Sequence, residues 1–319
     1  MPGVNRRHFL ALLGALLRPP SRLWRFGGAR ALDDRTDASA GQTSLPSRLI
    51  LLGTAGGPTP KKTRSGPSQI IVIGERGYVI DCGDGVARQM MAAGVFRTLR
   101  HIFVTHHHSD HNADYGNLLL LAWGDALKTP VDTWGPPPLA RITRLFFEMS
   151  AVDLRVRERD EGRPPLRPLV HPHEIGRGGF VMKDDLVTVT CAVVDHPLVP
   201  LALAYRFDCP DRSIVFSGDT RPSDALVALA RGADVLVHEV LYLPGAPGAP
   251  GSALRKHIID SHTTVGDAGK IATRAGVKTL VLSHFVPAEN PPVTDAQWLE
   301  EARGHFGGRI VVGHDLLEL

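Results

Sequence analysis

Residues 105–114, which read THHHSDHNAD, place four histidines and two aspartates within ten positions. Imidazole nitrogens and carboxylate oxygens are common protein ligands of zinc and related metals. A short apolar run, IFVT, precedes this segment, and the helical pattern NLLLLAWGDAL follows it. Because two rigid elements would hold the connecting turn, its side chains can keep the fixed geometry that a metal site requires. The segment therefore favours a metal-binding active site over a solvated loop rich in histidine.

Within this segment, His106, His108, Asp110 and His111 form the pattern H-x-H-x-D-H. Alternation along the chain directs His106 and His108 to one side, whereas Asp110 and His111 can turn toward a second point nearby. Four such ligands within six residues exceed what one tetrahedral zinc ion takes from a single loop. The pattern therefore predicts two adjacent metal ions.

Further ligands for such a site follow other predicted strands. His196 ends VTVTCAVVDH, Asp219 ends IVFSGD and His284 ends TLVLSH. Each is the first strongly coordinating side chain after an apolar run, at the strand end where α/β folds tend to build their sites. A single histidine in such a position is more often structural. Three residues in series are the set that a two-metal site still needs.

The order of the predicted elements indicates the fold class. RLILLG, QIIVIG and YVID predict early strands, and residues 85–94 predict a helix. VTVTCAVVDH, LALAYRF and SIVFSGD predict successive strands, after which ADVLVHE, KTLVLSHF and RIVVGHD alternate with helices at about 264–275 and 296–305. A β-rich start followed by such alternation predicts an α/β protein with helices covering two packed sheets.

The composition limits the classes of protein to which the chain can belong. The chain of 319 residues, 43% hydrophobic and 22% charged, is long enough to bury a sizeable core. Its formal net charge of +3 neither demands nor rules out nucleic acid as a partner. Cys82, Cys191 and Cys209 cannot make a disulfide framework, although one Cys191–Cys209 bridge stays open. No apolar run approaches the roughly 18 residues of a membrane span.

The N-terminal segment has the layout of an export signal. Arg6 and Arg7 stand directly before an apolar stretch, and ARA at 29–31 offers a cleavage site after Ala31. This order is typical of a twin-arginine signal peptide over residues 1–31 and predicts a periplasmic or exported protein. The alternative is a basic tail with a chance apolar patch. Residues 32–47 are polar and predict a linker, which leaves 48–319 as the folded domain.

These motifs together resemble a known family. Asp81 in DCGDG, then HHHSDH, His196, FSGDT and LSHF resemble the five ordered motifs of the metallo-β-lactamase-fold hydrolases. The resemblance covers about residues 48–319 and implies a four-layer αββα sandwich. It also implies a hydrolase in which two zinc ions share a hydroxide, which serves as nucleophile near neutral pH. One position could hold iron or manganese instead.

Carried over residue by residue, the resemblance assigns a role to each predicted ligand. Asp219 would bridge both metals, and Asp81 would orient the histidines from behind, although it could also cap the following helix, with Asp84 nearby. Each zinc ion would have three further ligands: His106, His108 and His196 for the first, and Asp110, His111 and His284 for the second.

Two further motifs indicate which branch of this family the chain resembles. VHEVLY supplies His238 and Glu239, and SHTTVGDAGKIA supplies His262, which resemble the paired His-Glu and His-Ser/Thr motifs of the ribonuclease Z and arylsulfatase-like branch. The resemblance implies that His262 protonates or stabilises the leaving group and that Glu239 tunes it. Thr264 would cap the next helix, whose N-terminus favours an anion. A strand histidine and a helix flank are the structural alternatives for His238 and His262.

Charged residues and histidines also occur outside these motifs. GTAGGPTPKKTRSG, residues 53–66, carries three cations that could face an anionic substrate or simply form a solvated loop: Lys61, Lys62 and Arg64. Other histidines are interpreted as surface or structural residues, including His107, His171, His173, His257 and His314.

The substrate is inferred from the middle of the chain. Ribonuclease Z carries a long, glycine-rich basic arm that grips transfer RNA, and residues 112–195 hold no segment identified with it. Glu158, Asp160 and Glu161 stand among the arginines there, which suits an RNA groove poorly. With the export signal, this favours an exported two-zinc hydrolase of small anionic esters, either phosphodiesters or aryl sulfates. Nucleic acid is disfavoured as a partner but stays open, and family members are often homodimers.

Two alternatives stay open beside this interpretation. A transfer-RNA 3′-end endonuclease of the ribonuclease Z type would require the export signal to be non-functional. A non-catalytic metal-binding scaffold belongs to another class, and the intact Asp110, Asp219 and His262 argue against it, because a degenerate site usually loses ligands. A β-lactamase is disfavoured, since those enzymes commonly have cysteine where Asp219 would bridge.

Overall fold

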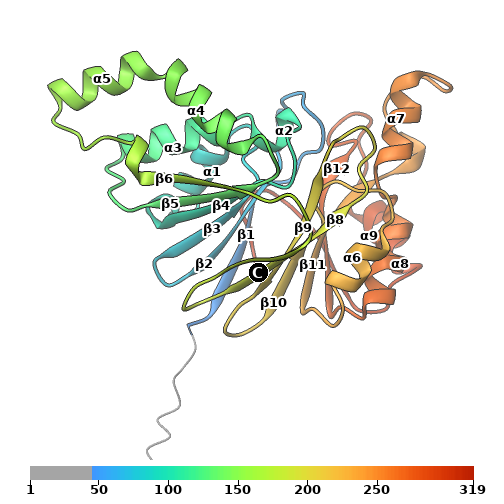
Figure 1. Cartoon of the computed structure of the whole chain (residues 1–319). Coiled ribbons are helices and arrows are strands. Elements are labelled where there is room, and N and C mark those ends of the chain that lie inside the picture. Colours follow the sequence, from blue (N-terminus) through green and yellow to red (C-terminus); the bar gives the residue numbers. More distant parts are fainter. Residues whose placement is uncertain (1–44) are drawn as a thin grey trace, which may run out of the picture. The chain divides into compact units, whose positions relative to one another are not determined.

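The computed structural model describes residues 45–319. The predicted signal peptide over 1–31 lies outside these residues, as does most of the predicted linker, so both stay predictions. Two seven-stranded sheets pack face to face, and helices cover both outer faces (Figure 1). This arrangement confirms the predicted α/β fold class, a four-layer αββα sandwich.

The first sheet contains the N-terminal strands, in the order β14-β1-β2-β3-β4-β5-β6. Its strands β1 to β3 pair antiparallel, and β3 to β6 pair parallel. The bounds are β1 (Ser47–Gly53), β2 (Ser68–Ile73), β3 (Arg76–Ile80), β4 (Leu99–Phe103), β5 (Val131–Gly135), β6 (Val170–Glu174) and β14 (Leu317–Glu318).

The second sheet repeats this plan in the order β13-β12-β11-β10-β9-β8-β7. Strands β7 to β10 pair antiparallel, and β10 to β13 pair parallel. The bounds are β7 (Gly179–Lys183), β8 (Thr188–Val194), β9 (Ala202–Asp208), β10 (Ser213–Phe216), β11 (Val235–Leu241), β12 (Thr279–Val286) and β13 (Arg309–Val312).

The helices are the crossover connections that parallel strands require. Those of the first half are α1 (Val86–Ala92), α2 (Ser109–Asn112), α3 (Tyr115–Gly124), α4 (Leu139–Met149) and α5 (Ala151–Asp160). Those of the second half are α6 (Asp224–Leu229), α7 (Ala253–Ser261), α8 (Val265–Ala275) and α9 (Asp295–Arg303).

Three apolar clusters hold the layers together. One lies between the inner faces of the two sheets and includes Phe103, Tyr205 and Phe207. The other two lie between each sheet and its helices. Because buried side chains stiffen both sheets, the loops at the strand ends start from fixed positions.

The structure also answers whether the cysteines are bridged and whether a helix could span a membrane. Cys82, Cys191 and Cys209 are all free thiols, so the bridge that the sequence left open is not formed. Within residues 45–319, none of the helices combines the length and the apolar character needed to span a membrane.

Candidate metal centre and active site

The predicted ligands converge at one edge of the sandwich. Residues 106–111 follow β4 and continue into α2, while His196 follows β8, Asp219 follows β10 and His284 lies in β12. All seven side chains lie in two overlapping clusters with Asp219 in both. Six are buried and His108 is half-buried. The structure therefore brings together every residue that the sequence predicted as a metal ligand.

The first cluster contains His106, His108, His196 and Asp219, whose ligand atoms all lie within 4.8 Å of one another. His108 Nδ1 lies 3.2 Å from His196 Nε2. His106 Nε2 lies 3.9 Å from Asp219 Oδ2. Burial lowers the pKa of His106 well below its usual value and that of His196 to about 4. These rings are therefore neutral at pH 7, which is the form that binds metal.

The second cluster contains Asp110, His111, Asp219 and His284. His111 Nε2 lies 3.2 Å from Asp219 Oδ1, and His284 Nε2 lies 3.2 Å from Asp219 Oδ2 and 3.4 Å from Asp110 Oδ2. Burial would lower the pKa of His111, but the charges of Asp219, Asp81 and Asp110 raise it well above its usual value. The imidazole and carboxylate groups of this cluster therefore attract one another as ion pairs.

Both clusters fit metal ions by two criteria. Metal–ligand bonds of about 2.0–2.2 Å separate the ligand atoms of a tetrahedral site by roughly 3.3–3.6 Å, and the distances above bracket this range. Moreover, the atoms that are buried without a hydrogen-bond partner among the described residues include four that face the clusters: His106 Nε2, His111 Nε2, His284 Nε2 and Asp219 Oδ1. Buried polar atoms rarely stay unpartnered, so these atoms are the ones that metal ions would satisfy.

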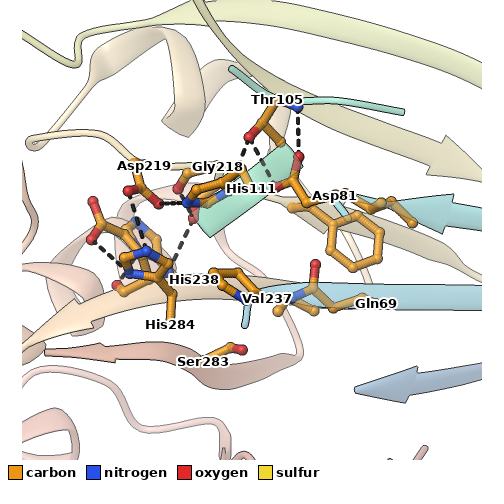
Figure 2. A pocket seen from close by; sticks show the side chains of 15 residues that line it. Gln69, Asp81, Thr105, His111, Gly218, Asp219, Val237, His238, Ser283 and His284 are labelled. Carbon is orange, nitrogen blue, oxygen red and sulfur yellow. Dashed lines mark hydrogen bonds and ion pairs between the residues drawn. The ribbon is translucent and has the colours of Figure 1, made fainter. Parts of the chain in front are cut away.

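Asp81 orients the cluster from behind. Its carboxylate accepts hydrogen bonds from the Thr105 backbone N–H at 2.7 Å and from the Thr105 hydroxyl at 2.9 Å. It also lies 2.8 Å from His111 Nδ1. Figure 2 shows His111 between Asp81 and Asp219. This contact leaves His111 Nε2 free to face the second cluster. Helix α1 has Gly85 at its N-cap and no side-chain cap, so the capping role considered for Asp81 is wrong.

Glu239, which is buried, and His262, which is partly buried, form a pair beside the clusters. His262 Nδ1 lies 2.6 Å from Glu239 Oε2, and Glu239 Oε1 accepts a 2.7 Å hydrogen bond from the Thr220 backbone N–H. Burial alone would lower the pKa of His262, but the charge and hydrogen bond of Glu239 raise it to about 9. His262 Nδ1 also lies 3.9 Å from Asp219 Oδ2. This pair can hold a proton at the edge of the metal centre.

An open pocket of about 690 Å³ lies over this centre. Its floor is formed by His108, Asp110, Asp219, His262 and His284. Its walls come from three segments: residues 56–61 after β1, residues 286–290 at the end of β12, and helix α7 with the preceding Pro247. A pocket of this volume holds a ligand of nucleotide size or larger.

Other residues singled out in the sequence lie as follows. Lys61 lines the pocket, whereas Lys62 is exposed and does not line it. Arg64 donates to Thr54 Oγ1 at 2.6 Å and to the Gly313 carbonyl at 3.0 Å, and its guanidinium lies 4.4 Å from the Phe285 ring centre. The expectation that Arg64 faces substrate is therefore wrong, because its guanidinium contacts residues at the ends of β1, β12 and β13.

Most of the other histidines singled out in the sequence make structural contacts, and one of them lines the pocket. His107 turns away from the centre to the Pro136 carbonyl, and His173 Nε2 lies 2.8 Å from Asp132 Oδ1, as structural residues do. His238 is buried behind the centre, with Nδ1 2.7 Å from the Glu239 carbonyl, and belongs to neither ligand cluster. His257 differs, because it lines the pocket. Its place on helix α7, which ends directly before His262, was not evident from sequence, where no helix was predicted for this segment.

Gly56 offers a test of how closely the centre is packed. An alanine Cβ there would lie 2.8 Å from His284 Nδ1 and 2.6 Å from Val286 Cγ2. We expect Gly56→Ala to displace His284 and to reduce metal affinity about 10- to 100-fold, as changes behind metal ligands do. Competition with a fluorescent chelator would measure this. Gly124→Ala is the matched control, because a Cβ there meets no atom within 4 Å; equal affinities in the two variants would contradict the expectation.

The comparisons with known proteins agree with this geometry. Residues 76–285 match the family described as Beta-lactamase superfamily domain. The chain is 36% identical to Ribonuclease Z of Mycobacterium bovis (strain BCG / Pasteur 1173P2) over 272 residues, which are 84% of this chain and 96% of that protein. It is 35% identical to Ribonuclease Z of Mycobacterium tuberculosis (strain ATCC 25618 / H37Rv), with 84% and 96% coverage.

Solved structures share the fold at lower sequence identity. Human tRNase Z, short form, superposes with a TM-score of 0.62 at 20% identity, over 85% of this chain and 98% of that chain. The metallo-β-lactamase fold protein YhfI of Bacillus subtilis gives a TM-score of 0.64 at 18% identity, over 86% and 99%. These likenesses show the fold, and the curated relatives show the branch. The chain belongs to the metallo-β-lactamase-fold hydrolases, and within them to the ribonuclease Z branch.

Proposed function

We propose that this protein is a metal-dependent phosphodiesterase of the ribonuclease Z type, which removes the 3′ extension from transfer-RNA precursors. The observation that carries the proposal is the Glu239–His262 pair at 2.6 Å beside two ligand clusters that share Asp219. The similarity to proteins named Ribonuclease Z over 84% of the chain supports the same reading. It favours the endonuclease alternative over the small-ester hydrolase expected from the middle segment.

The residues of the site would have two separate roles in such a reaction, metal binding and proton donation. Asp110, Asp219 and the five predicted histidine ligands would hold two divalent ions, most simply zinc. When bound, such ions supply a nucleophile near neutral pH and neutralise charge on the phosphate. Glu239 fixes His262 Nδ1, so that the ring lines the pocket with its Nε2 available. Because Glu239 raises the pKa of His262 to about 9, the ring holds a proton to donate to a departing ribose oxygen.

The class of ester is tested by turnover of two chromogenic substrates. We expect zinc-loaded protein to hydrolyse bis(p-nitrophenyl) phosphate and to leave p-nitrophenyl sulfate intact, with the diester activity lost in a chelator and restored by metal. Preferential sulfate turnover would contradict the proposal and return the arylsulfatase reading.

The place of the protein in the cell bears on the same proposal. The twin-arginine signal predicted over residues 1–31 would export the chain, whereas transfer-RNA precursors are made in the cytoplasm. We propose fractionation of cells that express the full chain, with immunodetection in each fraction. The endonuclease proposal expects the protein in the cytoplasm; recovery of nearly all of it from the periplasm would contradict it.

A further inference from the structure

One wall of the pocket has chemistry that the metal centre does not use. Helix α7 turns Leu254, His257 and Ile258 into the pocket, at the three- and four-residue spacing that places side chains on one helix face. Leu254 is 56% exposed, so this wall is open to a ligand. The facing wall, residues 56–61, carries Lys61. The pocket thus offers an imidazole beside two aliphatic side chains on one wall and an ammonium group on the other.

The cations near His257 are engaged elsewhere. Arg255 donates to the carbonyl oxygens of Leu243 and Ala246, which anchors the start of α7. Lys256 pairs with Asp260 on the helix surface. Since neither lines the pocket, His257 is the nitrogen donor that α7 presents to a ligand there.

His257 is also held in a defined orientation. Its Nδ1 lies 3.3 Å from Ser261 Oγ, and among the described residues its Nε2 makes no hydrogen bond. The Ser261 carbonyl in turn lies 3.0 Å from His196 Nδ1, and the next residue is His262. The last turn of α7 therefore connects the wall of the pocket to a metal ligand and to the predicted proton donor.

We propose that His257 binds the phosphate that neighbours the scissile phosphodiester in a nucleic-acid strand, an inference that rests on the proposed function. An imidazole N–H donating to a phosphate oxygen makes a charge-assisted hydrogen bond. Leu254 and Ile258 lie beside it and cover the apolar face of the intervening nucleoside. His257 is thus a specificity residue, which lets the site distinguish a strand with successive phosphates from an isolated diester.

The test uses two product-like ligands that differ by one phosphate, thymidine 5′-phosphate and thymidine 3′,5′-bisphosphate. Calorimetry on zinc-loaded protein would measure Kd for both. We expect the wild type to bind the bisphosphate more tightly, and His257→Ala to weaken bisphosphate binding about 10-fold, the usual effect of losing a hydrogen bond to a charged group. Its Kd for thymidine 5′-phosphate should stay within about twofold.

Two further variants make the result specific. Lys256→Ala, on the outer face of the same helix, should leave both Kd values unchanged, and His257→Asn, which keeps an N–H donor, should restore part of the preference. The inference is overturned if His257→Ala weakens both ligands equally, or weakens neither. Binding is measured without turnover, so failure of the chromogenic diester assay would reject the proposed function while the phosphate preference of His257 is still decided.

Discussion

Replacement of Asp219 with alanine is expected to abolish hydrolysis and to reduce the metal content of the purified protein from about two ions to one or none. The physical reason is that Asp219 is the one side chain in both ligand clusters. Its two oxygens lie 3.2 Å from His111 Nε2 and from His284 Nε2. Asp110 Oδ2 also approaches these two nitrogens, at 3.7 and 3.4 Å, but Asp110 belongs to the second cluster alone. Asp219 additionally lies 3.9 Å from His106 Nε2 in the first cluster. Elemental analysis and diester turnover measure the two effects.

The control for this variant must separate metal loss from unfolding. Removing one member of a buried ion pair costs about 3–5 kcal/mol, so Asp219→Asn, which keeps the shape, should be compared by thermal melting. Asp224→Ala provides the matched surface control, because the Asp224 side chain is 88% exposed and, among residues 45–319, pairs with Arg274 alone. A folded Asp219→Ala protein that retained full metal content would contradict the bridging role.

Replacement of His262 with alanine has the second largest expected effect, about 10²- to 10⁴-fold on kcat for an RNA substrate. The cause is loss of the proton that Glu239 stabilises on the ring. Metal content should not change, since His106, His108, His196 and the second cluster remain intact.

The leaving group provides the discriminating measurement. A departing ribose oxygen needs a proton, whereas p-nitrophenolate leaves readily without one. The loss in His262→Ala should therefore be large for RNA and small for bis(p-nitrophenyl) phosphate. Glu239→Gln should show the same pattern, because a neutral amide no longer raises the pKa of His262. An equal loss on both substrates would assign His262 to substrate binding or to the fold instead.

Much of the fold and the ligand set could be predicted from sequence, for a local reason. Strands β10 and β12 contain the continuous apolar runs IVF and LVL, and the first strongly coordinating side chain after each run, Asp219 and His284, lies within three residues of its end. The position of Asp219 in the metal centre could therefore be predicted from its own strand, without knowing how the rest of the chain folds. The capping prediction at Thr264 also holds, because its hydroxyl accepts the Asp267 N–H at 3.2 Å.

The elements that sequence reasoning missed depend on tertiary contacts. Helix α5 has one buried residue, Leu154, and no apolar stripe, so nothing in its sequence sets it apart from a polar loop. Strand β6 forms by pairing with β5 at the sheet edge, and its exposed His171 breaks the apolar pattern. Arg64 looked like a substrate contact because its partners, Thr54, Gly313 and Phe285, come from distant parts of the chain. The contacts of a cationic side chain in a loop therefore cannot be predicted from its spacing in the sequence alone.

The substrate was the weakest sequence inference, because it relied on the absence of a recognisable basic arm. Similarity to Ribonuclease Z of Mycobacterium bovis across 96% of that protein outweighs this absence. The pocket of about 690 Å³, with the side chains of α7 beyond the metal centre, has room for the strand that we propose as substrate.

The most direct test of the account is cleavage of an end-labelled transfer-RNA precursor that carries a 3′ extension. Zinc-loaded protein is predicted to release the extension by one cut at the 3′ end of the mature transfer RNA, with no product from the Asp219→Ala variant. Intact precursor after incubation with protein that hydrolyses bis(p-nitrophenyl) phosphate would contradict the endonuclease account and return the small-ester hydrolase.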